Sequence, residues 1–332
     1  MKEKNEVKKH TAFSVNLNDY YRDVKTEFQR HLEREISKES KSIAPLISKG
    51  IGEGKQLRPI LCRLVSDSLG GDAHSAFECG MALELIHCGT LIHDDWLDGD
   101  RFRREAPALW DELGPRTAIL VADLMVATGS LHGAISLATG KSLAVCARNL
   151  TEGAIADFTD KENYSESVYL DRIKRKTGAL YSTAAELGAL VSPRIDLASQ
   201  MHKFGETVGI MYQITDDYLD LLNSIITKTA IGDLALGIPT LPVTRLSRHP
   251  EYKGAIDIFV KTGKADKIIE HVKITDAQNI FEELISPWQE MSRKYLEEVP
   301  DSSHKLLLEQ VPMSFSNELI ASDKTKFHAD VF

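Results

Sequence analysis

The stretch "ALELIHCGTLIHDDWLD" (82–98) joins a long apolar segment to three closely spaced aspartates. From about residue 74 the segment is almost entirely apolar until the aspartates begin, which predicts a helix buried on all sides. Residues four apart share one face of a helix, so Asp94 and Asp98 are expected to converge, with Asp95 beside them. Like charges at this spacing destabilise a helix without a counter-charge. The stretch therefore predicts a cation site at the end of a buried helix.

A second stretch, "YQITDDYLD" (212–220), repeats this pattern with Asp216, Asp217 and Asp220. Carboxylate oxygens together with water suit Mg²⁺, so a hard divalent cation is the natural partner of both triads. A single such triplet could simply solvate the end of a helix, because short motifs often match by chance. Two copies make that alternative much weaker. We expect the two triads to meet across one cavity and to share magnesium.

The rest of the chain also has helical patterns, with no strand alternation and no linker between two halves. The segment 18–36 predicts a helix for which Asn18 is a plausible cap. Further helices are expected over residues 58–71, 74–98, 116–138, 141–160, 166–191 and 195–222, with several more from 240 to 310. One all-α domain over residues 16–312 is the economical organisation, with a flexible N-terminus (1–15) and a polar C-terminal tail (313–332).

Composition excludes several classes of protein. The 332 residues carry a net charge of −9, which argues against a nucleic-acid partner. No window approaches eighteen uninterrupted apolar residues, so no membrane span is expected. The charged N-terminus does not resemble a signal peptide, and four cysteines without metal-ligand spacing are typical of reduced thiols in a cytoplasmic protein.

Basic residues lie on either side of the first triad. "GEGKQLRP" (52–59) contributes Lys55 and Arg58, and Arg103 and Arg104 follow the aspartates directly. Each cluster alone is more typical of a solvated surface. Beside a carboxylate–metal site the two clusters predict an anion pocket, since arginine binds phosphate bidentately. Magnesium held between carboxylates also coordinates the oxygens of a diphosphate. It neutralises the negative charge on the diphosphate leaving group when a C–O bond breaks, and this chemistry suits ionisation of an allylic diphosphate.

His87 precedes Asp94 by seven residues, which places it on the same helix face about two turns away. An isolated buried histidine usually has a structural role. In this context we interpret His87 as a further diphosphate-binding residue.

At these residues the chain resembles the trans-polyprenyl diphosphate synthases, which elongate prenyl chains head to tail, and in particular the hexaprenyl- and heptaprenyl-type members. The resemblance covers roughly residues 20–310. It rests on an ordered series of motifs: "GKQLRP", "ALELIHCGTLIHDDWLD" with the following arginine pair, "YLDRIKRKTGALY", "YQITDDYLD" and "GIPTLP". It implies an isoprenoid-synthase-like helical bundle around a central cavity, a homodimer, and a product that is delivered to membranes.

The resemblance also implies a role for each matching residue. The isopentenyl diphosphate would be held by Lys55, Arg58, His87 and Arg104. About three Mg²⁺ would be held, two by Asp94 and Asp98 and a third by Asp216, with support from Asp95, Asp217 and Asp220. The allylic diphosphate would be surrounded by Arg103, Lys176, Thr177, Gln213 and Lys228. Catalysis would depend above all on Asp94, Asp98, Asp216 and Lys176, and the released pyrophosphate would take the proton.

The chain departs from the family pattern at three places. Ala154 stands where "GQxxD" has glutamine, Ile238 stands where "GKPTLP" has lysine, and the loop "TKTAIGD" is one residue shorter before Asp233. Loss of one cation and one amide would weaken the hold on the leaving group and slow turnover. Some family members require a second, non-catalytic subunit, and this chain is compatible with that arrangement.

The residues before the first triad also predict product length. Gly89 and Thr90 occupy the level at which short-chain relatives place an aromatic floor, so this level would be open. A floor would then form deeper, around Leu85, Ile86, Ala82 and Met81. The expectation is a product longer than C15, in the range C30–C40, for a quinone side chain. The alternative is that Gly89 merely allows close helix packing.

Two rival readings remain. A terpene cyclase shares the all-α architecture, but it usually lacks a complete second triad and the isopentenyl pocket. A non-catalytic partner subunit usually loses the aspartates, whereas this chain keeps six. Mg²⁺-dependent incorporation of isopentenyl diphosphate by the protein alone, then with partner subunits, separates these readings.

Overall fold

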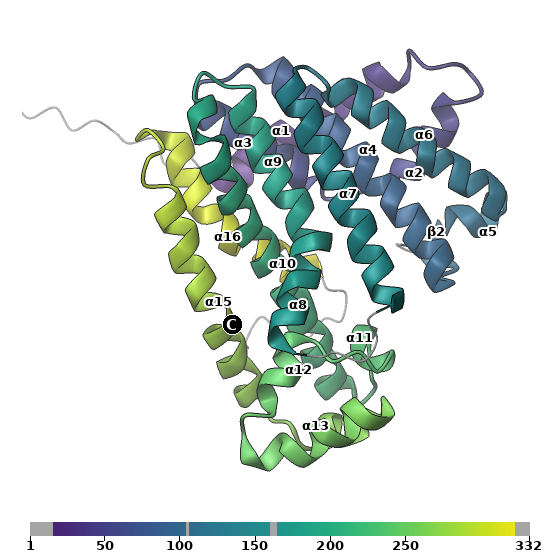
Figure 1. The fold of residues 1–332 in the computed structure, drawn as a ribbon, viewed down its shortest axis with the longest axis vertical. Coiled ribbons are helices and arrows are strands. Elements are labelled where there is room, and N and C mark those ends of the chain that lie inside the picture. Colours follow the sequence, from purple (N-terminus) through teal and green to yellow (C-terminus); the bar gives the residue numbers. More distant parts are fainter. Residues whose placement is uncertain (1–15, 104–105, 160–164, 323–332) are drawn as a thin grey trace, which may run out of the picture.

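The computed structural model describes residues 16–103, 106–159 and 165–322, which form a bundle of α-helices (Figure 1). The expectations for residues 1–15 and for Arg104 fall outside this described part. Within it, no helix is both long enough and apolar enough to cross a lipid bilayer. The all-α architecture predicted from the sequence is confirmed.

The elements in chain order are α1 (Leu17–Ile36), α2 (Ala44–Ile51), α3 (Leu57–Ser68), α4 (Ala73–Asp98), β1 (Phe102–Arg103), β2 (Ala106–Pro107), α5 (Leu109–Leu113), α6 (Pro115–Gly133), α7 (Leu137–Thr159), α8 (Glu166–Ile173), the π-helical turn η1 (Lys174–Gly178), α9 (Ala179–Leu190), the 3₁₀ turn η2 (Ile195–Leu197), α10 (Ala198–Thr227), α11 (Gly232–Ala235), α12 (Leu241–Leu246), α13 (Pro250–Thr262), α14 (Asp266–His271), α15 (Ile274–Tyr295) and α16 (Ser303–Ser322).

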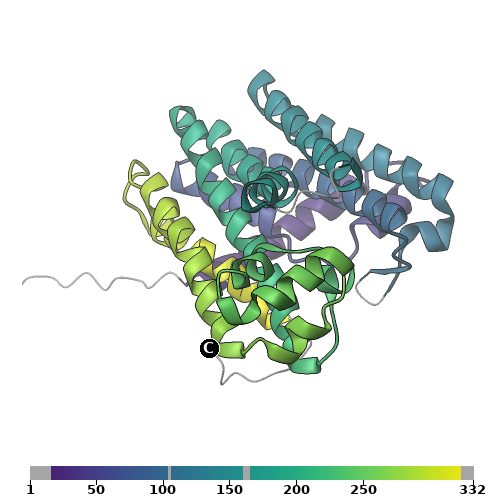
Figure 2. The same cartoon turned by 60° about the horizontal axis from the view of Figure 1, so that its bottom comes forward.

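Helix α4 lies at the centre of the bundle, between α6 on one side and α3 and α9 on the other. Buried apolar side chains form three groups in the described part of the chain. One lies between α3, α4, α9, the first half of α10 and α16; a second joins α1, α2, α4 and α6. The third joins the second half of α10 to α11–α15, and Figure 2 shows the short helices α11–α14 as a group in front of the long ones. The apolar stretch before the first triad is therefore core, as its composition predicted.

Local chemistry defines both ends of α4. The side chain of Asp72 accepts hydrogen bonds from the backbone N–H groups of His74 and Ser75 at 3.1 and 2.9 Å, which caps the first turn. Gly99 ends the helix with φ +75°, a conformation that glycine adopts without strain. The aspartates consequently occupy the last turn of a helix that is buried along most of its length.

The structure corrects several boundaries. Asn16, not Asn18, caps α1: its side chain accepts from the backbone N–H of Asn18 at 2.9 Å. Residues 166–191 form two helices separated by η1, because five residues adopt the wider π-helical turn. A two-residue antiparallel ladder pairs β1 with β2, although the sequence showed no strand pattern. The boundary after residue 312 falls inside α16, where Phe315 is buried in the core.

A polar contact ties α7, α9 and α10 together inside the bundle. The Glu186 carboxylate accepts a hydrogen bond from the Ser142 hydroxyl at 2.8 Å and one from Nδ1 of His202 at 2.9 Å. Burial raises the pKa of Glu186, but the bonds from His202 and Ser142 outweigh it, so the net shift is downward from 4.5. The bond to Glu186 raises the pKa of His202 above 6.5.

These shifts predict a pH-dependent loss of stability. Because the pKa of His202 is raised in the folded protein, its bond to Glu186 stabilises the fold fully below the unfolded histidine pKa of 6.5, and this stabilisation is lost as pH rises through the folded pKa. Because the pKa of Glu186 is lowered, the stabilisation from its carboxylate is fully present above the unfolded pKa of 4.5. The difference in free energy of unfolding between wild type and His202→Gln should therefore be largest below the unfolded histidine pKa of 6.5 and shrink as pH rises above it. Urea unfolding across this range measures it. His271→Gln, whose ring hydrogen-bonds a backbone oxygen, is the control; a pH-independent difference for His202→Gln would contradict the expectation.

Candidate active site

A cavity of about 420 Å³ opens where α4, α7, η1 and the start of α3 meet. Its polar wall brings together residues that are far apart in the sequence, namely Arg58, His87, Asp94, Lys176 and Thr177. Its apolar wall comes largely from α4 and α7, with Leu91, Leu97, Leu150, Ala154, Ile155 and Leu180. The structure therefore joins the first acidic motif, the "GKQLRP" arginine and the "RKTG" segment in one site.

The π-helical turn η1 accounts for two of these side chains. Lys176 and Thr177 lie within this turn, between α8 and α9, and both line the cavity. A π-helical turn inserted between α-helices is frequent at functional sites because it changes the direction in which side chains point. The sequence pattern of a continuous helix did not reveal this turn.

The guanidinium of Arg58 lies at the cavity wall, against an aromatic ring. It lies 5.0 Å from the centre of the Tyr181 ring. Its Nε is buried and has no hydrogen-bond partner in the described part of the protein. A buried, unsatisfied guanidinium nitrogen at a cavity wall is suited to an anionic ligand, since the desolvation of a cation is offset only by an acceptor. Lys55 is half-buried, does not line the cavity, and presents its backbone oxygen to the Tyr21 hydroxyl at 2.6 Å.

The aspartates of the first motif have different surroundings. Asp94 lines the cavity and is half-buried, and Asp98 is exposed at the helix end. Asp95 is only 3% exposed and pairs with Arg103, whose Nε lies 2.7 and 2.9 Å from its two carboxylate oxygens. Arg103 belongs to β1, so this ion pair holds the segment that follows α4 against the last turn of that helix. Asp95 thus has a protein cation as its partner.

The second motif shows the same division. Asp217 is 4% exposed, whereas Asp216 is exposed and Asp220 is half-buried. The Tyr169 hydroxyl donates to one oxygen of Asp217, and Nε2 of Gln213 donates to the other at 2.9 Å. Burial raises the pKa of Asp217 to about 8, against the lowering effect of these two hydrogen bonds. In both motifs the second aspartate is buried and held by the protein.

Gln213 connects the second motif to the cavity. Its Oε1 accepts a hydrogen bond from the Thr177 hydroxyl at 2.7 Å, and its Nε2 lies 3.4 Å from an oxygen of Asp216. A chain of side-chain contacts therefore runs from Tyr169 through Asp217 and Gln213 to Thr177 in the cavity wall. Tyr169 was not singled out in the sequence analysis, although it opens the "YLDRIKRKTGALY" stretch.

The loop before α11 packs directly on the second motif. A Cβ at Gly232 would lie 1.7 Å from Oδ2 of Asp220, and its φ of +54° also favours glycine. Asp233 is close enough to contribute to the raised pKa of Asp217. Lys228, by contrast, ends α10 with its Nζ donating to the backbone oxygen of Ile269 at 3.0 Å, on α14.

A second cavity of about 300 Å³ lies between α4, α6 and α7. It shares Thr90, His93 and Thr151 with the first cavity, and Ile86 and Val126 belong to its apolar wall. Thr90 therefore lines both cavities, together with His93 and Thr151.

Gly89 has a different environment. A Cβ at this position would lie 2.9 Å from the backbone oxygen of Ala122 and 3.0 Å from Val126, both on α6. Gly89 lines neither cavity. The structure favours the alternative that Gly89 permits close packing of α4 against α6.

The Asp95–Arg103 pair gives a stability prediction. Arg103→Ala should lower the free energy of unfolding by about 2–4 kcal/mol, because it leaves a buried carboxylate without its cation. Arg101→Ala is the matched control: Arg101 pairs with Asp111 at 3.0 Å but is 69% exposed, so its loss should cost about 0–1 kcal/mol. Urea unfolding of both variants measures the two losses of free energy of unfolding. Equal losses would show that the buried Asp95–Arg103 pair stabilises the fold no more than the exposed Arg101–Asp111 pair does.

Comparison with known proteins identifies the family. The family model described as Polyprenyl synthetase matches residues 40–274. Geranylgeranyl diphosphate synthase of Sulfolobus acidocaldarius is 35% identical over 206 residues, 58% of this chain and 62% of that protein, which is less than two thirds of its length. Heptaprenyl diphosphate synthase component 2 of Bacillus subtilis is 32% identical over 263 residues, 74% of this chain and 75% of that protein.

The fold matches as well. A solved structure of polyprenyl synthase from Caulobacter crescentus CB15, complexed with calcium and isoprenyl diphosphate, superposes with a TM-score of 0.73 at 23% identity, over 91% of this chain and 98% of that chain. The family match covers most of the described helices and both acidic motifs. The chain belongs to the polyprenyl synthetase family of prenyltransferases.

Proposed function

We propose that the protein condenses an allylic diphosphate with isopentenyl diphosphate in a magnesium-dependent reaction and releases a trans-polyprenyl diphosphate longer than C15. One observation carries this proposal: Asp94 shares a cavity of about 420 Å³ with Arg58, His87 and Lys176, and the same cavity has an extensive apolar wall. Carboxylate, cations and apolar surface in one space match the three parts of the chemistry, which are metal, diphosphate and prenyl chain.

The residue types of the two motifs suit magnesium. Asp94 and Asp98 on α4, with Asp216 and Asp220 on α10, would supply carboxylate oxygens, which are the ligands that Mg²⁺ takes together with water and phosphate oxygens. Bound magnesium would neutralise the charge that develops on the departing diphosphate. Asp95 and Asp217 would act by positioning, since protein groups already engage them. The calcium in the Caulobacter relative supports a divalent site of this kind.

The chain's own side chains would bind and orient the two substrates. Arg58, with its unsatisfied buried nitrogen, and His87 would hold the diphosphate of isopentenyl diphosphate. Lys176 and Thr177 from η1 would contact the allylic diphosphate, and Gln213 would hold Thr177 in place. The apolar wall of α4 and α7 would exclude water from the carbocation. The isopentenyl double bond attacks that cation, and the released pyrophosphate accepts the proton lost from the condensed product.

Activity of the isolated protein tests the proposal. Incubation with farnesyl and isopentenyl diphosphates should give Mg²⁺-dependent incorporation of isopentenyl units, and Asp94→Asn should lower kcat at least about 10²-fold because a ligand to the metal is lost. His202→Gln, outside the cavity, is the control and should retain activity. Incorporation that persists without a divalent ion, or in Asp94→Asn, would refute the assignment.

The need for a second subunit is settled by the same assay. The Bacillus subtilis relative is named component 2 of its enzyme, which supports a two-component arrangement as the alternative to a homodimer. Activity of the isolated chain supports the homodimer, whereas activity that appears only after addition of a candidate partner subunit supports the heteromer.

Product length depends on the second cavity. We expect products in the range C30–C40 from the wild type, and Thr90→Phe should shorten them because Thr90 stands where the two cavities join. Gly89→Phe should instead lower the Tm, since its side chain points at the backbone of α6. Chromatography of the dephosphorylated products gives chain length, and thermal unfolding gives Tm. A wild-type product that stops at C15–C20, or an unchanged length in Thr90→Phe, would contradict this assignment.

A further inference from the structure

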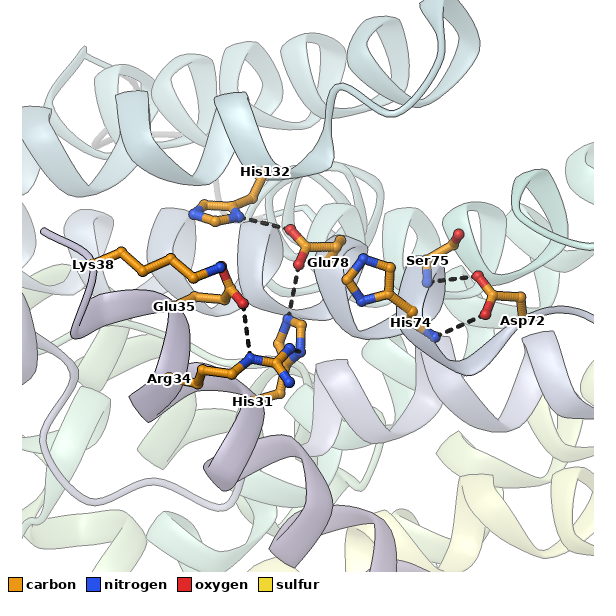
Figure 3. A network of polar contacts seen from close by, with 9 residues as sticks. All are labelled: His31, Arg34, Glu35, Lys38, Asp72, His74, Ser75, Glu78 and His132. Atoms are coloured by element: carbon orange, nitrogen blue, oxygen red, sulfur yellow. Dashed lines mark hydrogen bonds and ion pairs between the residues drawn. The ribbon is translucent and has the colours of Figure 1, made fainter.

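Three histidines and a glutamate gather at the end of α4 that is remote from the cavity. His74 and Glu78 lie in the first turns of α4, His31 comes from α1 and His132 from the end of α6 (Figure 3). Sixteen residues separate Glu78 from Asp94 on the same helix, a rise of about 24 Å. None of the four lines the catalytic cavity. The cluster therefore requires an explanation independent of the prenyl transfer.

Three potential ligand atoms converge in this cluster. One atom each of His31, His74 and Glu78 lies within 4.8 Å of the other two. His74 and Glu78 are one helical turn apart and share a face of α4, and the imidazole rings of His31 and His74 are 5.8 Å apart between centroids. Figure 3 shows these side chains pointing toward one another. Two imidazoles and one carboxylate form a donor set that zinc takes, with water in the fourth position.

The strongest evidence for a ligand comes from Nε2 of His31, a buried nitrogen. Its side chain is 5% exposed, and its Nε2 lies 3.0 Å from Oε1 of Glu78. The geometry of this contact is not that of a hydrogen bond, so Nε2 is a buried nitrogen without a hydrogen-bond partner in the described part of the chain. A buried nitrogen of this kind is satisfied by a cation placed between it and the carboxylate.

We propose that His31, His74 and Glu78 bind a zinc ion that ties α1 to α4. Ligand atoms around tetrahedral zinc are about 3.3 Å apart, and the three atoms here lie within 4.8 Å of one another, so small side-chain movements bring them to that spacing. The side chain of His74 is exposed and free to make such a movement. Glu78 would contribute Oε1 to the ion, while its Oε2 keeps the contact with Nδ1 of His132 at 2.7 Å. His132 would thus position Glu78, as outer-shell partners of metal ligands do.

A second combination, Glu35, Glu78 and His132, also brings three ligand atoms together. It is the weaker set because Glu35 is engaged by cations, namely Arg34 at 3.1 Å and Lys38. These pairs lower the pKa of Glu35 to about 2, chiefly through the hydrogen bond from Lys38. The first set, in which two of the three ligands are imidazoles, is the one that selects zinc over magnesium.

Arg34 gives the proposal a distinctive consequence. It donates a hydrogen bond to Nδ1 of His31 at 2.9 Å, which holds the proton of the neutral ring on Nε2. Coordination through Nε2 needs the other tautomer, so Arg34 must turn away when zinc binds. Its side chain is 59% exposed and already touches Glu35, so this movement is local. Arg34 is therefore a competitor of the metal, and its removal should tighten binding.

Titration of the metal-free, full-length protein with zinc chloride in excess magnesium tests the proposal. We expect one zinc per chain by atomic spectroscopy after dialysis. The Tm should rise by about 5 °C when zinc exceeds its Kd about 100-fold. Absence of bound zinc, or binding without any rise in Tm, would overturn the proposed clamp.

Variants identify the ligands. His74→Ala alters an exposed residue and should weaken binding at least about tenfold, and Glu78→Gln should do the same. Arg34→Gln should strengthen it. His202→Ala is the matched control, because His202 also contacts a glutamate but lies outside the cluster. Zinc that is retained in His74→Ala and Glu78→Gln, or that is lost in Asp94→Asn instead, would place the ion elsewhere and refute the assignment.

Discussion

The burial of one carboxylate in each acidic motif is the constraint on which the site depends. Asp95 and Asp217 hold the second place of their motifs and are 3% and 4% exposed. A charge in that position is costly unless the protein supplies a partner. Arg103 does so for Asp95. Asp217 instead accepts hydrogen bonds from the neutral Tyr169 and Gln213, and its burial raises its pKa to about 8. Because residues one and five of each motif share a different face of the helix from residue two, Asp94 and Asp98, like Asp216 and Asp220, are directed elsewhere.

This division explains how a protein with a net charge of −9 can handle anionic substrates. The basic residues are local: Arg58, His87 and Lys176 line the cavity together with Asp94, while Arg103 pairs with the buried carboxylate of Asp95. Thr90 lines both this cavity and the second one between α4, α6 and α7. Helix α4 thus contributes polar and apolar side chains to the same wall.

Much of this was predictable from spacing and composition. The acidic repeat, the arginine of "GKQLRP" and the buried helix before Asp94 are local patterns, and the structure has each in the expected element. Other features were not predictable, because they arise where segments distant in sequence meet. Tyr169 acquires its role only from the burial of Asp217, and Gly89 faces α6 because of the way two helices pack. The π-helical turn η1 interrupts a sequence that reads as one continuous helix.

The sequence by itself determined the all-α class, the two acidic motifs and the family, because helical periodicity and motif spacing are properties of neighbouring residues. Only the tertiary structure decided which aspartates are buried, which cations reach the cavity and which residues gather around Glu78. Burial, ion pairing and the convergence of ligands depend on contacts between helices, and no local pattern specifies the distance between His31 on α1 and Glu78 on α4.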